Sequence, residues 1–286
     1  MSFFPANNYN LAATLASGQA FRWYPNVQGA WEGVIGREFL MLRQQPNGIE
    51  AHSSNANPNS SAIQHYLQTD IDIDAITATF PNDPPMQAAI AACRGLRLLR
   101  QDPWECLASF ILSSTKQIVQ IQQIVGALCE CYGEEISMAA VCPCSNNSLR
   151  FAFPSAAKLA SLSEPQLRSC KMGFRAPYLL KTARLISSGE LDLESLRKMK
   201  TPEARETLCT LPGVGEKIAN CVLLFAYGFQ DAFPVDVWVQ KAIRQLYFPK
   251  RKPSAKRLKH FVQTHFGPNA GYAQQYLFHY MRTQRL

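Results

Sequence analysis

Residues 210–217 read Thr-Leu-Pro-Gly-Val-Gly-Glu-Lys, and residues 233–236 downstream read Phe-Pro-Val-Asp. Gly213 and Gly215 allow the backbone to approach a ligand closely, and the N–H groups that open the next helix can bind a phosphate. Lys217 falls in the first turn of that helix, where the positive end of the helix dipole disfavours an added positive charge. The segment therefore predicts a phosphate-binding turn that places an amine nucleophile beside its ligand.

Basic residues are concentrated after this segment. The 286-residue chain has a formal net charge of +8, from 29 Lys and Arg residues against 21 Asp and Glu residues. Residues 241–286 hold ten of the basic residues and none of the acidic ones. A solvated basic face would account for the charge alone. Because the charge directly follows a phosphate-binding turn, nucleic acid is the favoured partner.

The overall composition indicates an ordinary globular protein, with 47% hydrophobic and 17% charged residues. No apolar run has transmembrane length, and the first residues lack the cationic start of a secretory signal peptide. We therefore expect an intracellular monomer with no membrane partner. Its compartment would be the cytoplasm and nucleoid of a bacterium, or the nucleus of a eukaryote.

The nine cysteines of an intracellular chain are expected to be free thiols. An alternative is a four-sulfur zinc site made by Cys129, Cys131, Cys142 and Cys144. Cys-x-Cys pairs are unusual zinc ligands, and a helix is expected to end near Gly133, so free thiols are favoured.

Hydrophobic patterning predicts an α+β protein. Three strands are expected within residues 20–54, at 20–24, 30–35 and 39–43, separated by turn signals. The sequence predicts an N-terminal domain over 1–85, with an antiparallel sheet and helices, and an all-helical body over 86–286. The expected helices cover 60–68, 73–80, 86–92, 103–114, 117–131, 155–161, 174–188, 202–209, 215–227, 236–246, 254–265 and 270–283.

Five segments together carry a family resemblance that covers nearly the whole chain. They are Ser-Gly-Gln-Ala-Phe-Arg-Trp at 17–23, Leu-Leu-Arg-Gln-Asp-Pro-Trp-Glu-Cys at 98–106, Gly-Phe-Arg-Ala-Pro-Tyr at 173–178, the 210–217 turn, and Gly-Tyr-Ala-Gln-Gln-Tyr-Leu-Phe at 271–278. In this order they resemble the eukaryotic-type 8-oxoguanine glycosylases, lysine-bearing members of the helix-hairpin-helix DNA glycosylases. The resemblance places the helix-hairpin-helix at about 202–228. It implies a bifunctional glycosylase and abasic-site lyase acting on 8-oxoguanine in double-stranded DNA.

The resemblance implies roles for two catalytic residues. Lys217 would attack C1′ of the damaged nucleotide and form an imine. Asp236 also matches the N-cap of a following helix, and it would stabilise the positive charge that develops on the sugar. No cofactor is expected, and no iron–sulfur cluster, because related clusters use cysteines after the hairpin and the last cysteine here is Cys221. A structural monovalent cation is expected at backbone carbonyls of the hairpin, namely those of Cys209, Leu211 and Val214.

The resemblance also implies a pocket for the extruded base. Gln274 and Phe278 are spaced i, i+4 on one helix face, where Phe278 would stack on the base and Gln274 would bond its Watson–Crick edge. The carbonyl of Gly18 would accept the proton on N7, which 8-oxoguanine has and guanine lacks. Cys221 and Pro234 complete the expected base-binding set.

Further positions are expected to contact DNA. The resemblance assigns the backbone at Gly213, Gly215 and Ile218 to a phosphate, with Phe174 as a wedge and Arg175 on the partner base. Thr115 and Gln120 stand where the family has an asparagine and an arginine that read cytosine. We therefore predict relaxed selectivity for the base opposite the lesion. Trp238 replaces a histidine of animal and fungal enzymes, which indicates a bacterial-like branch.

Two other functions remain open from the sequence. One is a glycosylase for another damaged purine, which Lys217 disfavours because monofunctional relatives lack this lysine. The other is a non-catalytic helix-hairpin-helix DNA-binding protein, which Asp236, Gln274 and Phe278 together disfavour.

Overall fold

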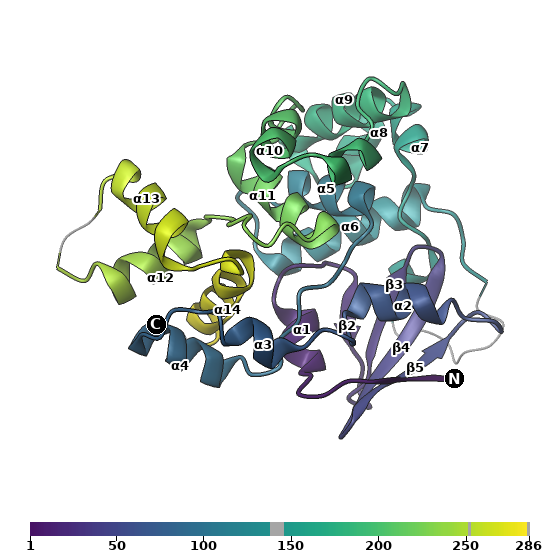
Figure 1. The fold of residues 1–286 in the computed structure, drawn as a ribbon. Helices are drawn as coiled ribbons and strands as arrows, with labels where there is room; N and C mark the ends of the chain where they lie inside the picture. Colours follow the sequence, from purple (N-terminus) through teal and green to yellow (C-terminus); the bar gives the residue numbers. More distant parts are fainter. Residues whose placement is uncertain (138–145, 251–252, 285–286) are drawn as a thin grey trace.

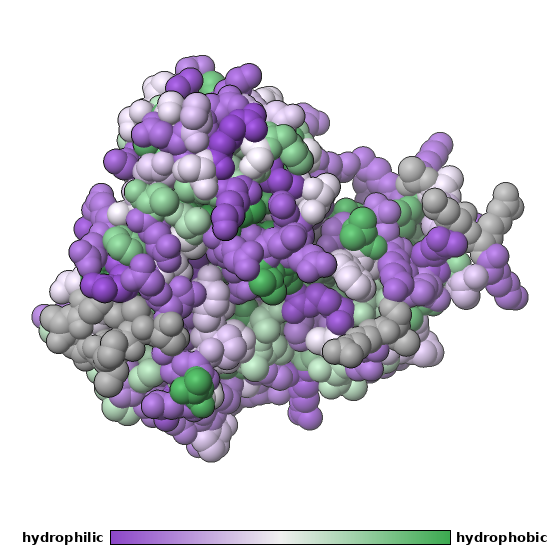
Figure 2. Space-filling view, turned by 180° about the vertical axis from the view of Figure 1, so that it is seen from behind, coloured by the Kyte–Doolittle hydropathy of each residue, from purple (hydrophilic) through white to green (hydrophobic). Residues whose placement is uncertain are grey.

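The computed structural model describes residues 1–137, 146–250 and 253–284, and every structural statement below concerns these residues. The chain forms an antiparallel sheet with flanking helices, followed by a larger group of helices from which α12 and α13 project (Figure 1). Seen from behind, hydrophobic residues form small patches on a mostly hydrophilic surface (Figure 2). None of the described helices is long and apolar enough to cross a membrane.

The sheet has five strands in the order β1-β5-β4-β3-β2, and every neighbouring pair is antiparallel. The strands are β1 Ser2–Pro5, β2 Trp23–Pro25, β3 Trp31–Ile35, β4 Glu38–Gln45 and β5 Gly48–Ser53. Leu40, Leu42 and Ile49 are fully buried in a core that they share with residues of α1 (Leu11–Ala16) and α2 (Ser60–Leu67). One sheet face therefore packs on these short helices, as expected for an alternating pattern.

The remaining helices form the second part of the molecule. They are α3 Ile73–Thr77, α4 Pro84–Ala92, α5 Pro103–Leu112, α6 Ile118–Tyr132, η1 Asn147–Arg150, α7 Ala156–Ala160, α8 Glu164–Ser169, η2 Gly173–Arg175, α9 Ala176–Ser187, η3 Glu194–Lys198, α10 Thr201–Cys209, α11 Glu216–Val222, the π-helical η4 Leu223–Tyr227, α12 Val237–Tyr247, α13 Ala255–His265 and α14 Ala270–Thr283. The α+β prediction is confirmed, and the predicted helices match these elements within a few residues.

Several of the helices that the sequence predicts begin at a side-chain cap. The Asp102 carboxylate accepts the Glu105 N–H at 2.8 Å, and Pro103 occupies the first turn of α5. Ser254 caps α13 in the same way, through the Arg257 N–H. Both helices therefore begin at a side-chain acceptor that can be read in the sequence.

The structure corrects several predicted elements. The strand expected over 20–24 begins only at Trp23, because Phe21 turns into the helical core and Arg22 donates to the Phe151 carbonyl. The prediction missed α1 and α8, although Asn10 caps α1 and a capping box opens α8. It also missed β1 and β5, which pair with each other at the sheet edge. The expected 215–227 helix is α11 followed by a π-helical turn.

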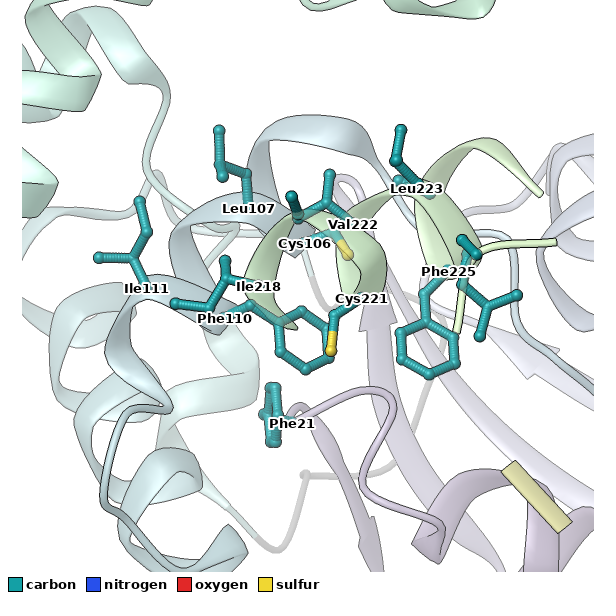
Figure 3. Close-up of a cluster of buried hydrophobic side chains, with 14 of the residues drawn as sticks. Phe21, Cys106, Leu107, Phe110, Ile111, Ile218, Cys221, Val222, Leu223 and Phe225 are labelled. Carbon is teal, nitrogen blue, oxygen red and sulfur yellow. The ribbon is translucent and has the colours of Figure 1, made fainter. Parts of the chain in front are cut away.

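The helical core is centred on α5, α11 and η4. Phe110 stacks on Phe225 with ring centroids 5.7 Å apart, and Phe21 meets Phe110 edge-on at 5.4 Å. Figure 3 shows Cys221 projecting from α11 to the side on which the rings of Phe110 and Phe225 lie. α14 packs against both α4 and α12. The predicted domain boundary at residue 85 falls inside α4, and this division of the chain stays a prediction.

Candidate active site

Five segments that are distant in sequence meet at one cleft of about 850 Å³. They are the loop after α1, the loop after α5, the first turn of α11, the start of α12 and the second half of α14. The predicted site residues that line the cleft are Gly18, Thr115, Lys217, Ile218, Asp236 and Phe278.

A smaller recess of about 40 Å³ shares its mouth residues with this cleft. Lys217, Asp236 and Phe278 line both spaces, and the predicted base-binding residues Cys221, Pro234 and Gln274 line only the recess. A cavity of this size holds a few water molecules at most. The recess is therefore too small for a purine while Phe278 keeps this position.

The hairpin between α10 and α11 presents free N–H groups. Gly213 has a φ of 78°, and a Cβ there would lie 2.8 Å from the Cβ of Tyr178, so only glycine fits. Within the part of the chain that the structure describes, the N–H groups of Gly213, Gly215 and Lys217 have no hydrogen-bond acceptor. Three unpaired donors at a helix start can bind an anion such as a phosphate.

Lys217 projects from the first turn of α11 and is half-buried. Its Nζ lies 5.0 Å from the centre of the Phe110 ring. Cys221 lies one turn further along the same face, and burial raises the pKa of its thiol to about 11 although Lys217 opposes this shift. At neutral pH the thiol is therefore protonated and is a weak nucleophile.

Asp236 is the N-cap of α12, as the sequence indicates. Its Oδ1 accepts the Val239 N–H at 2.8 Å. Burial raises the pKa of this carboxyl, while its hydrogen bond from Val239 and the charge of Lys217 act in the opposite direction. A capped, partly desolvated carboxylate is held in one place and interacts strongly with nearby positive charge.

Asn220, a buried residue that the sequence analysis did not assign, connects the two catalytic segments. Its Nδ2 donates to the Phe233 carbonyl at 3.3 Å, and its Oδ1 accepts from Arg205 Nε at 2.9 Å. Because Asn220 lies on α11 with Lys217, the bond to Phe233 holds the 233–236 loop against that helix, and the bond from Arg205 joins the helix to α10. Its position three residues after Lys217 was the available signal.

The loop that contains Gly18 is rigidly held. Gly18 has a φ of 76°, and a Cβ there would lie 2.6 Å from Ile118 Cδ1. Gln275 of α14 donates to the Ser17 carbonyl at 2.9 Å, and buried Gln19 donates to the Arg97 carbonyl at 2.8 Å. The Gly18 carbonyl has no hydrogen-bond donor among the described residues, so it is available to a ligand.

Gln274 and Phe278 share one face of α14, as predicted. Gln274 is 3% exposed, and its Oε1 has no hydrogen-bond partner within the described chain. A buried, unpaired amide oxygen costs free energy, so it is poised for a donor that enters the recess. Phe278 lines both the recess and the wider cleft.

The residues expected at the partner base contact each other instead. Arg175 is 3% exposed, and its Nη2 donates to the Ser114 carbonyl and to Thr115 Oγ1. Its guanidinium also covers the Phe174 ring at 4.3 Å, and Phe174 itself is 54% exposed. Phe174 is thus available as a wedge, whereas Arg175 must leave its contacts before it can reach a base.

Gln120 has a local structural role in this state. Its Oε1 accepts the Gln117 N–H at 3.1 Å and completes the capping box of α6. Thr115 has a φ of 57°, an unusual value for a β-branched residue. The sequence showed both positions to be atypical but did not reveal these contacts.

Two of the three hairpin carbonyls expected to hold a monovalent cation are free within the described residues, and the cation stays a prediction. Leu211 accepts the Val214 N–H at 3.1 Å, which leaves it a second lone pair, and the carbonyls of Cys209 and Val214 remain unbonded in the described residues. No group of three or more His, Cys, Asp or Glu side chains suited to a metal occurs in the part of the chain described. The zinc alternative also needs Cys142 and Cys144, which lie outside the described residues.

The hairpin with its free N–H groups, the Lys217 amine and the Asp236 capping carboxylate thus meet at one cleft, and the family models that match the chain describe base excision DNA repair proteins. Residues 108–268 match the family described as "HhH-GPD superfamily base excision DNA repair protein". Residues 2–107 match "8-oxoguanine DNA glycosylase, N-terminal domain". The chain therefore belongs to the 8-oxoguanine DNA glycosylase family of the HhH-GPD superfamily.

Individual relatives agree with this assignment. The chain is 32% identical to N-glycosylase/DNA lyase OGG1 of Arabidopsis thaliana, over 94% of this chain and 76% of the relative. It is 29% identical to a probable N-glycosylase/DNA lyase of Methanothermobacter thermautotrophicus, over 99% of this chain and 96% of the relative. It also resembles the Clostridium acetobutylicum 8-oxoguanine glycosylase/lyase, solved with DNA containing cytosine opposite 8-oxoG, with a TM-score of 0.89, 29% identity and coverage of 100% and 99%.

Proposed function

We propose that the protein is a bifunctional DNA glycosylase and abasic-site lyase that removes 8-oxoguanine from double-stranded DNA in base excision repair. It would work as a monomer in the compartment that holds the genome. The observation that carries the proposal is the cleft itself, where the Lys217 amine and the Asp236 carboxylate share a mouth with Gly18 and with the recess behind Phe278. Family membership and the names of the relatives support the same activity.

In the proposed mechanism Lys217 is the nucleophile. Its amine forms a bond to C1′ while the bond from C1′ to the base nitrogen N9 breaks, and the electron pair leaves with the base, which takes up a proton. Opening of the sugar ring then gives an imine between Lys217 and C1′. Loss of a proton from C2′ expels the 3′ phosphate by β-elimination and cuts the strand.

Asp236 stabilises this reaction electrostatically. Positive charge appears on the sugar only as the base departs, so a fixed carboxylate nearby binds the transition state more strongly than the ground state. The N-cap bond to Val239 holds the carboxylate in place before the substrate arrives. The half-buried setting increases its effect, because water screens the charge less.

The recess selects the base. The open Gly18 carbonyl accepts the N7 proton of 8-oxoguanine, whereas guanine would direct a lone pair at it. The unpaired Gln274 oxygen accepts from the Watson–Crick edge, which supplies the donor it lacks in this state. Phe278 moves aside and stacks on the extruded base, opposite Cys221.

The hairpin and the basic C-terminal stretch hold the DNA. The free N–H groups of Gly213, Gly215 and Lys217 bind a phosphate near the lesion, beside the backbone of Ile218. A monovalent cation on the carbonyls of Cys209, Leu211 and Val214 would fix the shape of this turn and add positive charge near the phosphate. The residues of 241–286 add sequence-independent attraction.

Selectivity for the partner base is proposed to be relaxed. Thr115 and Gln120 replace two cytosine-reading side chains of the family, and Gln120 caps a helix here. Arg175 alone remains, and in this state it binds Ser114 and Thr115. Arg175 must therefore break these hydrogen bonds before it can contact cytosine.

Borohydride trapping tests the proposed function directly. The wild-type chain is incubated with a duplex that contains one 8-oxoguanine and with a matched guanine duplex, and the imine is reduced to a permanent crosslink. The proposal predicts a crosslink and a cut strand with the lesion only. A chain that binds both duplexes but crosslinks neither would be a DNA-binding protein, and one that crosslinks a preformed abasic site but not 8-oxoguanine would act on another base.

A further inference from the structure

Arg282 is a half-buried cation at the lip of the base pocket with no role assigned so far. It lies on α14 one turn after Phe278 and two turns after Gln274, so the three residues share a helix face. Its guanidinium carbon lies 5.7 Å from the centre of the Phe278 ring, and the residue lines the large cleft together with Lys217.

One nitrogen of this guanidinium is bonded and another is unsatisfied. Nη2 donates to the Ala16 carbonyl, which positions the group against the loop before Gly18. Nη1 is buried and has no acceptor among the described residues. It lies 3.2 Å from the point where a Cβ on Gly18 would be. A buried N–H of a charged group without an acceptor is unfavourable, so Nη1 would gain from a ligand atom that accepts a hydrogen bond.

The geometry of the pocket indicates which ligand atom this is. Gln274 lies deep in the recess, and Arg282 lines only the outer cleft. A base whose Watson–Crick edge meets Gln274 has O6 at the deep end and its sugar at the mouth. Because C8 neighbours the nitrogen that carries the sugar, O8 also lies toward the mouth, beside the N7 proton that Gly18 accepts.

We propose that Arg282 determines lesion specificity by donating a hydrogen bond from Nη1 to O8 of the extruded 8-oxoguanine. The inference rests on the proposed function. Gly18 and Arg282 together would read two adjacent features of the oxidised imidazole edge, a donor at N7 and an acceptor at C8. Guanine has neither feature and would leave both groups unsatisfied.

Binding measurements with matched bases test this assignment. All proteins carry Lys217→Gln so that no base is excised, and Arg282→Met is compared with the parent. The duplexes contain 8-oxoguanine, 8-thioguanine, guanine or a tetrahydrofuran abasic analogue. 8-Thioguanine keeps the N7 proton but has sulfur, a weak acceptor, in place of O8. We expect Arg282→Met to weaken 8-oxoguanine binding roughly tenfold or more, as for a charged hydrogen bond, and to change binding of the other duplexes little.

Each alternative gives a different pattern. Equal losses with 8-oxoguanine and 8-thioguanine would mean that Arg282 only supports the Gly18 loop through Ala16. An equal loss with the tetrahydrofuran duplex would place the guanidinium on a phosphate. Either result, or no loss at all, overturns the assignment.

A second measurement separates this inference from the proposed function. With Lys217 intact, Arg282→Met should slow single-turnover excision of 8-oxoguanine but cleave a preformed abasic site at the parental rate, because that reaction involves no base. A parent enzyme that cleaves abasic sites but never excises 8-oxoguanine would refute the proposed function. A parent that excises it at the same rate as Arg282→Met would refute only the role of Arg282.

Discussion

Residues around the lesion pocket are held by packed helices, whereas Arg175 and Thr115, expected at the partner base, lie on the short η2 turn and on the loop after α5, which contact each other. Lys217, Gln274 and Phe278 project from α11 and α14, and Asp236 caps α12. Arg175 of η2 instead donates a hydrogen bond of 2.7 Å to Thr115 Oγ1 in the loop after α5. Lys217 and Asp236 are thus in place before DNA arrives and only Phe278 has to move to admit a base, while the partner-base contacts depend on a wider rearrangement. The first region should show large effects of mutation and the second small ones.

The largest expected effect is at Lys217. Lys217→Gln should abolish the borohydride crosslink with 8-oxoguanine DNA, because the only proposed nucleophile is gone, while DNA binding persists through the other cations. Lys116 lines the same cleft and is the matched control, since Lys116→Gln should crosslink normally. Crosslinking by the Lys217 variant and not by the Lys116 variant would show that Lys116 is the nucleophile.

Asp236→Asn should slow single-turnover excision roughly 10²- to 10³-fold, because the transition state loses a fixed charge. Asparagine can still cap α12, so the cap's contribution of about 1 kcal/mol is retained. Asp102→Asn, at the cap of α5 away from the cleft, is the control and should excise normally. Equal activity losses in both variants would indicate that capping, not charge near the sugar, explains the effect.

The raised pKa of the Asp236 carboxyl predicts opposite pH trends for stability and activity. Burial raises the pKa of its carboxyl in the folded state, so the folded protein holds this proton more tightly than the unfolded chain. The contribution of Asp236 to the free energy of unfolding therefore falls as pH rises from the ordinary aspartate range through the raised pKa. Excision should rise over the same interval, because the ionised form is active.

Urea unfolding and single-turnover excision, each measured as a function of pH, test these trends. Asp236→Asn should be at least as stable as the wild type at neutral pH, since it removes a desolvated charge. A variant that is clearly less stable, or an excision profile that does not fall on acidification, would contradict this account.

The smallest effects are expected at the residues predicted to lie near the partner base. Excision opposite A, G and T should approach the rate opposite C. The remaining preference for C should come from Arg175 and be worth roughly 1–3 kcal/mol, the value of one good base contact. Arg175→Ala should remove that preference, and Gln120→Ala should leave it unchanged because Gln120 caps α6. Four duplexes that differ only in the partner base provide the measurement. A preference above about a thousandfold, unaffected by Arg175→Ala, would place the discrimination elsewhere.

The same contrast explains what the sequence could predict. Helical spacing placed Gln274 and Phe278 on one face, and cap signals placed Asp236 at the start of α12, because both depend on local geometry. The burial of Arg175 against Ser114 and Thr115 depends on how two distant loops meet, which no local pattern records. Arg282 was missed although its spacing from Phe278 was visible, because an arginine near a helix end is usually solvated.

The order of the segments along the chain has a consequence for biosynthesis. A ribosome makes the hairpin, Lys217 and Asp236 before it makes α14, which supplies Gln274, Phe278 and Arg282 and also packs on α4. A nascent or truncated chain that ends before residue 270 would hold the reactive amine without the side chains that recognise the lesion. Its apolar residues on α4 and α12 would also be uncovered, so such fragments should be substrates for chaperones and proteases before they can act on DNA.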